Sequence, residues 1–375
     1  MIFNLIFFLS FLISGLVSQE AFAHDFAIYK EAIELIKNNY YNPQVIKKSF
    51  SEYNINTCKI GLSEYDSIKC LIQKLKDPYT KFLTPKEALQ ESRRIRTVTA
   101  GTGIILDPLN PVIIAMVQAG SPAAKAGLKS QDQLLAINDN PVELLSDREI
   151  NNSLKDLKVG QKVKIDFERG YAVYTSRIEA KEIEAISIRS KFIEQNILYV
   201  KIDDLLSNKA YDVFKSIIIS QNKKTKIKGL IIDLRDNTGG LLKNAITIAD
   251  YLLEKGNIVT IESLQGLNNI KAKSLAIYKG PIVILMDDQT ASASEIIAAA
   301  LIDNKKAISI GNRTFGKGLV QQIKVLADDS ALHITVNKFY RPNGKEIHKV
   351  GIKPDMDIKD EREQLKVAIK YLRGN

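Results

Sequence analysis

Beyond about Ile183, the hydrophobic and polar positions of the chain follow two alternating periods. Short, continuous apolar runs indicate buried strands, whereas longer stretches with apolar residues every three or four positions indicate helices. The pattern predicts strands at 197–202, 229–234 and 281–286 that alternate with helices at 211–220, 241–253 and 294–303. Such alternation is typical of an α/β fold with a mostly parallel sheet. Sites in these folds gather where strands end and helices begin.

The first half of the chain has a different pattern of apolar residues. From His24 to about Ile95, apolar residues recur at helical intervals, which predicts an N-terminal helical region at 24–95. From 96 to 182, short β-like runs with glycine turns predict a mainly β region. Within it, Ser121–Gly127 predicts a short helix, because serine caps it, proline follows and glycine ends it.

The N-terminus carries the pattern of an export signal. Residues 2–17 are almost wholly apolar, and Ala21-Phe22-Ala23 offers the small residues of a signal-peptidase site. The apolar run is shorter than the roughly 20 residues of a membrane-spanning helix. We therefore expect a cleaved signal peptide at 1–23 and a periplasmic or secreted protein. No Lys or Arg precedes the apolar run, which leaves an uncleaved inner-membrane anchor as the alternative.

Composition narrows the class of protein. The 375 residues are 45% hydrophobic and carry a net charge of +10, which is enough apolar material for several folded domains. The lysines are dispersed, and the short cluster at 223–228 is typical of a solvated turn, so no nucleic-acid partner is expected. Three histidines argue against a metal enzyme, and no metal or organic cofactor is predicted. Cys58 and Cys70 are either one disulfide or two buried thiols.

Three segments could carry chemistry. Thr290-Ala-Ser-Ala-Ser-Glu295 joins a predicted strand to a helix, and either Ser292 or Ser294 could be a helix cap or a nucleophile beside unpaired helix N–H groups. The turn 233–240 either needs glycine for positive φ or aims a backbone N–H at a ligand. The segment 311–318 is similar to a phosphate-binding P-loop, but Gly318 replaces the required Ser or Thr, and a predicted strand follows.

Together these segments resemble the carboxyl-terminal processing peptidases, also called tail-specific proteases. The resemblance covers nearly the whole chain and rests on the segments Asp77-Pro-Tyr-Thr-Lys-Phe-Leu83, Gly120-Ser-Pro-Ala-Ala-Lys-Ala-Gly127, Asp233-Leu-Arg-Asp-Asn-Thr-Gly-Gly240, Ser292-Ala-Ser-Glu295, Phe315-Gly-Lys-Gly-Leu-Val-Gln321, Phe339-Tyr-Arg-Pro-Asn-Gly344 and Gly351-Ile-Lys-Pro-Asp355. It departs from the family pattern at Thr238, where proline is common, and at Gln131, where glycine is usual. It implies a PDZ domain at 96–182 and a crotonase-like α/β serine peptidase core at 183–375.

The resemblance also implies the catalytic residues. Ser292 would be the nucleophile and Lys317 its general base, which must be neutral to act and therefore needs a pKa lowered by burial. Gln321 could orient the amine. Asp303 would lie about 16 Å from Ser292 along one helix, at roughly 1.5 Å per residue, so it is expected to have a supporting role. Ala293 N–H, with Gly239 or Gly240, is expected to form the oxyanion hole.

The PDZ region is expected to bind a free C-terminal carboxylate. Successive N–H groups around Gly101, Thr102 and Gly103 could converge on the anion, Ile104 and Ile105 could line a pocket for the last side chain, and the helix 121–127 would form the other wall of the groove.

The predicted function is therefore serine endopeptidase cleavage of protein or peptide substrates that have free apolar C-termini. A non-catalytic PDZ adaptor and, less favoured, a P-loop NTPase are the alternatives. The sequence leaves open a homo-oligomer and a peripheral or N-terminal association with membrane.

Overall fold

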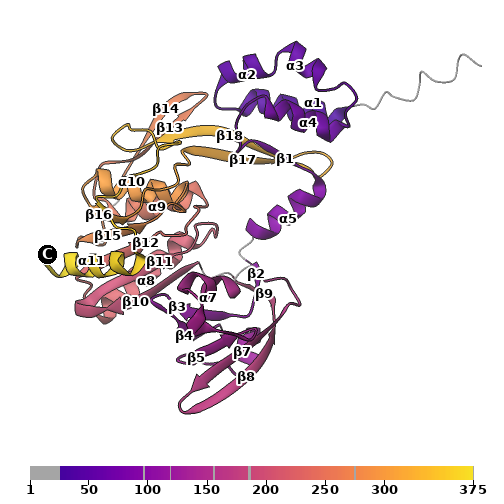
Figure 1. Cartoon of the computed structure of the whole chain (residues 1–375). Coiled ribbons are helices and arrows are strands. Elements are labelled where there is room, and N and C mark those ends of the chain that lie inside the picture. Colours follow the sequence, from indigo (N-terminus) through magenta and orange to yellow (C-terminus); the bar gives the residue numbers. More distant parts are fainter. Residues whose placement is uncertain are drawn as a thin grey trace, which may run out of the picture.

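The structure is a computed structural model that describes residues 26–95, 98–118, 120–154, 157–184, 187–273 and 276–374. The predicted signal peptide at 1–23 lies outside these residues. The described chain forms an N-terminal helical region (26–95), a β-rich region (98–184) and an α/β body (187–374). Figure 1 shows the N-terminal helical region at the top, the β-rich region at the bottom and the α/β body beside both.

The α/β body is built on a six-stranded sheet whose strand order is β10-β11-β12-β15-β16-β19. The strands from β11 to β19 run parallel, and β10 is antiparallel to β11. The predicted alternation of strands and helices is confirmed. The elements of the sheet and its helices are β10 (Ile188–Ile193), β11 (Ile197–Ile202), α8 (Ala210–Lys224), β12 (Gly229–Asp233), α9 (Leu242–Leu252), β15 (Ile282–Met286), α10 (Ala293–Asp303), β16 (Ala307–Gly311), β19 (Met356–Asp357) and α11 (Glu361–Gly374).

Helices cover both faces of this sheet, which explains why its strands read as continuous apolar runs. Side chains alternate across the sheet. Leu230 and Ile232 pack into the core that holds residues of α8, α9 and α10, and Ile231 packs into the core formed with α11. A strand buried on both sides must be apolar at every position, and β12 is.

A second sheet connects distant parts of the chain. It contains β1 (Lys81–Leu83), β18 (Ala331–Tyr340), β13 (Asn257–Ser263) and β14 (Gly266–Lys271) in that order, with β17 (Leu319–Val325) on the other edge of β18. The sequence pattern did not predict β1, because a strand of three residues carries no measurable period. Its partner, β18, lies about 250 residues away along the chain, with Phe82 opposite Leu332.

The N-terminal helical region shares its core with this second sheet. Leu332 and Ile334 of β18 pack into the same cluster as the helices, so the helical region is continuous with the α/β body. Cys58 and Cys70 form a disulfide between the end of α3 and α4. The helices are α1 (Ala27–Asn39), α2 (Pro43–Ser49), α3 (Glu52–Thr57), α4 (Glu64–Gln73) and α5 (Pro85–Ile95).

The β-rich region has its own core and one five-strand path, β3-β4-β5-β7-β8, with β6 beside β5. It begins and ends with the paired strands β2 and β9. Its elements are β2 (Val98–Gly101), β3 (Ile104–Asp107), β4 (Asn110–Val117), α6 (Pro122–Lys125), β5 (Gln133–Ile137), β6 (Asn140–Pro141), η1 (Val142–Leu144), α7 (Asp147–Ser153), β7 (Lys162–Arg169), β8 (Ala172–Glu179) and β9 (Lys181–Glu184).

The predicted helix at 121–127 is present as the shorter α6, and its role as a groove wall stays a prediction. Helix α6 packs against β8 and closes the turn before β3, where Ala123 N–H donates to Thr102 O. Helix α7 is the one that packs against β4, the neighbour of β3. Helix α6 has four residues, whereas α7 has seven.

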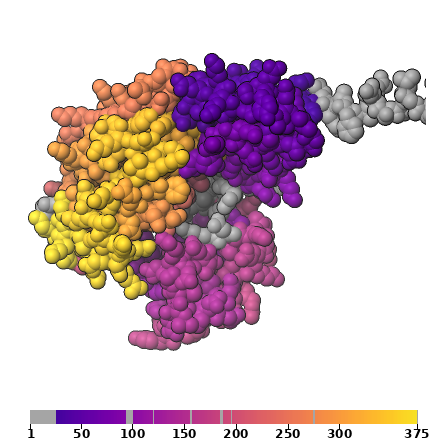
Figure 2. All heavy atoms as spheres, turned by 45° about the horizontal axis from the view of Figure 1, so that its top comes forward, coloured from indigo at the N-terminus to yellow at the C-terminus, as the bar shows by residue number. Residues whose placement is uncertain are grey.

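Ion pairs on two sides join the β-rich region to the α/β body, one group at Arg148 and the other at Asp107. Arg148 of α7 contacts Asp236 at 2.7 Å, and Lys191 of β10 contacts Asp107 at 2.5 Å. In the space-filling view the surface is hollowed between the N-terminal helical region, the body and the β-rich region (Figure 2). None of the described helices is both long and apolar enough to cross a bilayer.

Candidate active site

Ser292 lies at a strained corner between β15 and α10. It is the residue just before the first turn of α10, and its φ of 57° and ψ of −120° are unusual for a residue with a side chain. Ser292 is half-buried, whereas Ser294 is fully buried and its hydroxyl has no hydrogen-bond partner. Of the two candidate serines, only Ser292 is within reach of a substrate.

The glycine turn after β12 packs directly against this corner. Gly239 has a φ of 103°, and a Cβ placed on it would lie 2.9 Å from Ser292 Cβ and 2.8 Å from Ala291 O. The position therefore requires glycine both for its φ and for the close approach. The N–H of Gly239 donates to Asn237 Oδ1. Within the described residues, the N–H groups of Gly240 and Ala293 have no acceptor, which leaves both available to a ligand.

Buried charge fixes the start of that turn. Asp233 is fully buried and is bound by Arg235, Lys201 and the Tyr199 hydroxyl. Burial alone would raise the pKa of Asp233, but Arg235 and Lys201 outweigh it and hold that pKa below its usual range. The Asp-Leu-Arg part of the motif therefore anchors the turn and keeps Gly239 against Ser292.

Glu295 links the Ser292 corner to the lysine loop. This fully buried carboxylate accepts the backbone N–H of Ser292 at 2.9 Å, of Gly316 at 2.9 Å and of Lys317 at 2.8 Å, and the Thr314 hydroxyl at 2.5 Å. Burial raises the pKa of Glu295, and these four hydrogen bonds oppose the rise. The sequence analysis quoted Glu295 in a motif but gave it no role. The spacing Ser-x-x-Glu, a capping-box signature, was the signal that could have found it.

Lys317 follows β16 on a loop that Gly316 allows to pass close to another part of the chain. A Cβ on Gly316 would lie 2.9 Å from Gly351 N, and its φ is 88°. Lys317 is half-buried. Burial lowers the pKa of Lys317, the charge of Lys81 lowers it further, and Asp77 opposes the shift. A lysine with a lowered pKa can be neutral near the working pH, as a general base must be.

The backbones of Ser292 and Lys317 are joined through Glu295. In the part of the chain that the structure describes, no hydrogen bond joins Ser292 Oγ to Lys317 Nζ. Catalytic hydrogen bonds are often longer before substrate binds. Gln321 of β17 donates to Thr335 Oγ1 at 3.3 Å, so its side chain is directed at β18. Asp303 forms a two-pronged ion pair with Arg341, which suits a supporting role at the end of α10.

The P-loop alternative is excluded by the geometry of 311–318. A P-loop cradles phosphate with free backbone N–H groups and continues into a helix. Here the N–H groups of Gly316 and Lys317 bind a carboxylate of the same chain, and the strand β17 follows.

The predicted carboxylate cradle lies at the start of β3. Thr102 and Gly103 are buried, and within the described chain their N–H groups have no acceptor. A Cβ on Gly103 would lie 2.2 Å from Ser121 Cβ, so this turn passes directly over the cap of α6. Ile104 and Ile105 follow it in the exposed edge strand β3, where both are half-buried. Gly101 ends β2, opposite Lys181 of β9.

Comparisons with known proteins agree with this arrangement. Residues 196–358 match the model of peptidase family S41, and residues 91–179 match the model of the PDZ domain. The chain is 34% identical to the carboxy-terminal processing protease CtpA of Bacillus subtilis over 294 residues, which cover 77% of this chain and 62% of that protein. It is 32% identical to the carboxyl-terminal-processing protease of Synechocystis sp. over 305 residues, 78% of this chain and 70% of that protein.

A solved structure gives the same match. The photosystem II D1 C-terminal processing protease aligns with a TM-score of 0.60 and 25% identity, over 90% of this chain and 94% of that one. Fold and sequence thus define a serine peptidase of the S41 type that carries a PDZ domain. Within that class, the chain belongs to the family of carboxyl-terminal processing proteases.

Proposed function

We propose that this protein is an endopeptidase that cleaves protein substrates near their C-termini, with Ser292 as nucleophile and Lys317 as general base. The observation that carries the proposal is the shared carboxylate of Glu295, which fixes the backbones of both residues. Neutral Lys317 would take the proton of Ser292 Oγ as the oxygen attacks the scissile carbonyl. The protonated amine would then give that proton to the leaving amine, and water would hydrolyse the acyl-enzyme with Lys317 again as base.

The oxyanion would be bound by backbone N–H groups. Ala293 opens α10 and has a free N–H beside Ser292, where the positive end of the helix dipole favours negative charge. Gly240 supplies the second free N–H, because that of Gly239 is already bound to Asn237. Gly239 would then contribute only by its missing side chain, which allows the turn to pack against Ser292.

The PDZ domain would select the substrate by its free carboxylate. The unpaired N–H groups of Thr102 and Gly103 form a backbone anion cradle, and the open edge of β3 can pair with an extended peptide. The ion pair between Arg148 and Asp236 joins the PDZ domain to the turn that holds Gly239 and Gly240. The PDZ domain therefore directly contacts the turn that would form part of the oxyanion hole.

We propose that the mature protein begins near His24 and is periplasmic or secreted. The export pattern at 1–23 and the disulfide between Cys58 and Cys70 support this location, because disulfides persist in oxidising compartments.

The proposal is tested by identifying what the enzyme cuts. C-terminal fragments of exported proteins should be found by mass spectrometry in cells with the wild-type chain and be lost in cells with Ser292→Ala. Identical fragment patterns in both would refute the proposal. Purified mature protein should also react covalently at Ser292 with a fluorophosphonate, which reports the activated serine without any peptide substrate.

A further inference from the structure

The amine of Lys317 contacts a segment that lies far from the S41 region in sequence. Lys317 Nζ lies over the ring of Tyr79, 4.9 Å from its centroid. Tyr79 belongs to the turn between α4 and β1 in the N-terminal helical region. Its ring also meets His348 edge-on, at 6.1 Å between centroids. The candidate general base is therefore covered by an aromatic face from outside the α/β body.

Asp77 fixes the position of this turn. Its carboxylate accepts the N–H of Tyr79 at 2.9 Å and the hydroxyls of Thr80 and Thr335, each at 2.7 Å. Gln321 donates to the same Thr335 hydroxyl. Asp77 therefore holds the backbone of Tyr79 directly and is linked to Gln321, four residues beyond Lys317, through the Thr335 hydroxyl.

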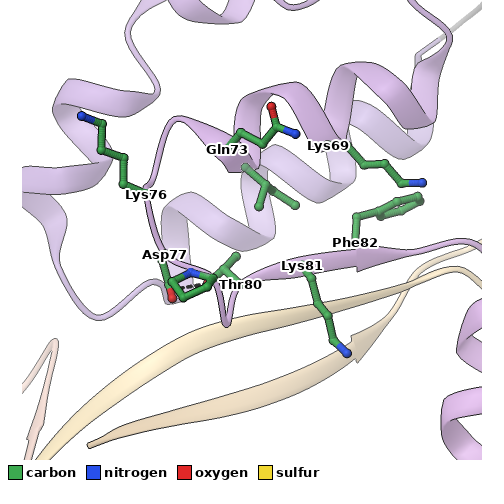
Figure 3. A pocket seen from close by; sticks show the side chains of 9 residues that line it. Lys69, Gln73, Lys76, Asp77, Thr80, Lys81 and Phe82 are labelled. Atoms are coloured by element: carbon green, nitrogen blue, oxygen red, sulfur yellow. Dashed lines mark hydrogen bonds between the residues drawn. The ribbon is translucent and has the colours of Figure 1, made fainter. Parts of the chain in front are cut away.

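Tyr79 has different surroundings from its neighbours in the turn. An open cavity of about 490 Å³ is lined by Lys76, Asp77, Pro78, Thr80, Lys81 and Phe82, but not by Tyr79. Figure 3 shows this face, with Asp77 bonded to Thr80 and with Lys69 and Gln73 on the helix across the cavity. Of the residues from 76 to 82, Tyr79 is the one that does not line the cavity, and its ring lies beside Lys317 Nζ instead.

We propose that Tyr79, held by Asp77, is a positioning residue for the Lys317 amine, so that the N-terminal helical region completes the active site. The ring excludes water from one side of the amine and presents a π face that favours N–H groups and positive charge. This inference rests on the proposed role of Lys317 as general base. A purely structural role for Tyr79 would leave the titration of Lys317 unchanged.

Several charged and titratable groups surround the amine. The pKa of Lys317 is lowered by burial and then by Lys81, and Asp77 opposes this shift. Burial raises the pKa of Tyr79, and the charges of Asp77 and of Glu295 in α10 raise it further. The side chain is therefore a neutral phenol at working pH. His333 of β18 has a lowered pKa, first from burial and then from Lys81, with a contribution from Lys317. His348 has a lowered pKa mainly from burial, so it is uncharged at neutral pH.

The test compares three replacements of Tyr79 by their rate of fluorophosphonate labelling at Ser292 as a function of pH. Tyr79→Phe keeps the π face and should label like wild type. Tyr79→Leu keeps the bulk of the side chain but removes the π face. Its limiting labelling rate should fall about tenfold or more, because the amine is held less well. The midpoint of its pH profile should move to lower pH, because the attraction of the ring for the protonated amine is lost. Tyr79→Ala admits water, so its midpoint should move to higher pH.

Controls separate this inference from the proposed function. Lys69 lines the same cavity without contacting Lys317, so Lys69→Gln should have the labelling rate and pH midpoint of wild type. Thermal melting should show that every variant is folded. A wild-type protein that is not labelled at Ser292 would refute the proposed function itself. A labelled wild type whose Tyr79→Leu and Tyr79→Ala variants keep its limiting rate and its midpoint would overturn only the positioning role of Tyr79.

Discussion

The backbone N–H groups of Ser292 and Lys317 converge on one carboxylate oxygen, Oε2 of Glu295, at 2.9 and 2.8 Å. The two residues lie on different elements, and this buried anion fixes their separation. A side chain reaches its partner reliably only if its backbone is fixed, and errors of about 1 Å can cost about a hundredfold in rate. We therefore expect Glu295 to affect catalysis through the positions of these two residues.

Replacement of Glu295 by Gln should abolish most activity and destabilise the protein. The amide keeps one acceptor oxygen but turns an NH₂ group towards backbone N–H donors, which leaves buried donors unpaired at a cost of about 1–3 kcal/mol. We expect kcat/KM to fall by about a hundredfold or more. Peptide cleavage and thermal melting measure the two effects. Unchanged kcat/KM in a stable Glu295→Gln variant would contradict the linking role.

The two serines of the motif should differ sharply on replacement by alanine. Ser292→Ala should have no measurable cleavage, because it lacks the nucleophile. Ser294→Ala should cleave at a measurable rate and melt no lower than wild type, because its buried hydroxyl has no partner to lose. A dead Ser294→Ala beside an active Ser292→Ala would reverse the nucleophile assignment.

Lys317 should make the folded protein less stable below its own pKa. Burial lowers the pKa of Lys317 in the folded state, so the unfolded chain binds the proton more tightly. The loss of folding stability is complete at pH values below the pKa of Lys317 in the folded protein. It shrinks as pH rises and vanishes above the pKa of Lys317 in the unfolded chain, near 10.5. Lys317→Met should therefore melt above wild type at pH 7, and the difference should shrink towards pH 10. Equal melting temperatures at every pH would exclude a strained, buried amine.

The same lowered pKa predicts the pH dependence of cleavage. The wild-type rate should rise with pH through a midpoint below the ordinary pKa of lysine, because only the neutral amine can accept the serine proton. Initial rates on one peptide from pH 6 to 10 measure this, and melting curves confirm that the protein stays folded. A flat profile over that range would argue against a lysine base.

A peptide with a free C-terminal carboxylate should be cleaved faster than its amidated form. The backbone cradle at Thr102 and Gly103 can bind an anion but gains much less from a neutral amide. We expect kcat/KM to fall on amidation, and also when the last apolar residue is replaced by Asp, with the scissile bond unchanged. Equal cleavage of the acid and the amide would leave the PDZ domain without its proposed role.

Much of the α/β body could be predicted from the sequence, because its strands are buried on both faces and its helices have ordinary periods. The predicted strand at 197–202 has the same limits as β11, and the predicted helix at 241–253 differs from α9 by one residue at each end. The hairpin of β13 and β14 was missed. β14 is largely exposed, so it carries no apolar run to mark it.

The active site was predicted less completely, because motifs identify reactive groups better than the groups that hold them. The local segments left Ser292 and Ser294 both open, and the resemblance to the peptidase family selected Ser292 and Lys317. The contacts of Tyr79 and Asp77 depend on β1 pairing with β18, and no local pattern reveals a pairing over that distance.

The pairing of β1 with β18 also constrains when the enzyme can become active. Thr80 and Thr335 are bonded although 255 residues separate them, and the helical core at the N-terminus is closed by Leu332 and Ile334. During synthesis or export, the N-terminal helices emerge first and must wait for the last quarter of the chain to bury their apolar faces. The contact between Lys317 and the ring of Tyr79 would form at the same stage. A chain that still lacks β18 would therefore be an inactive precursor.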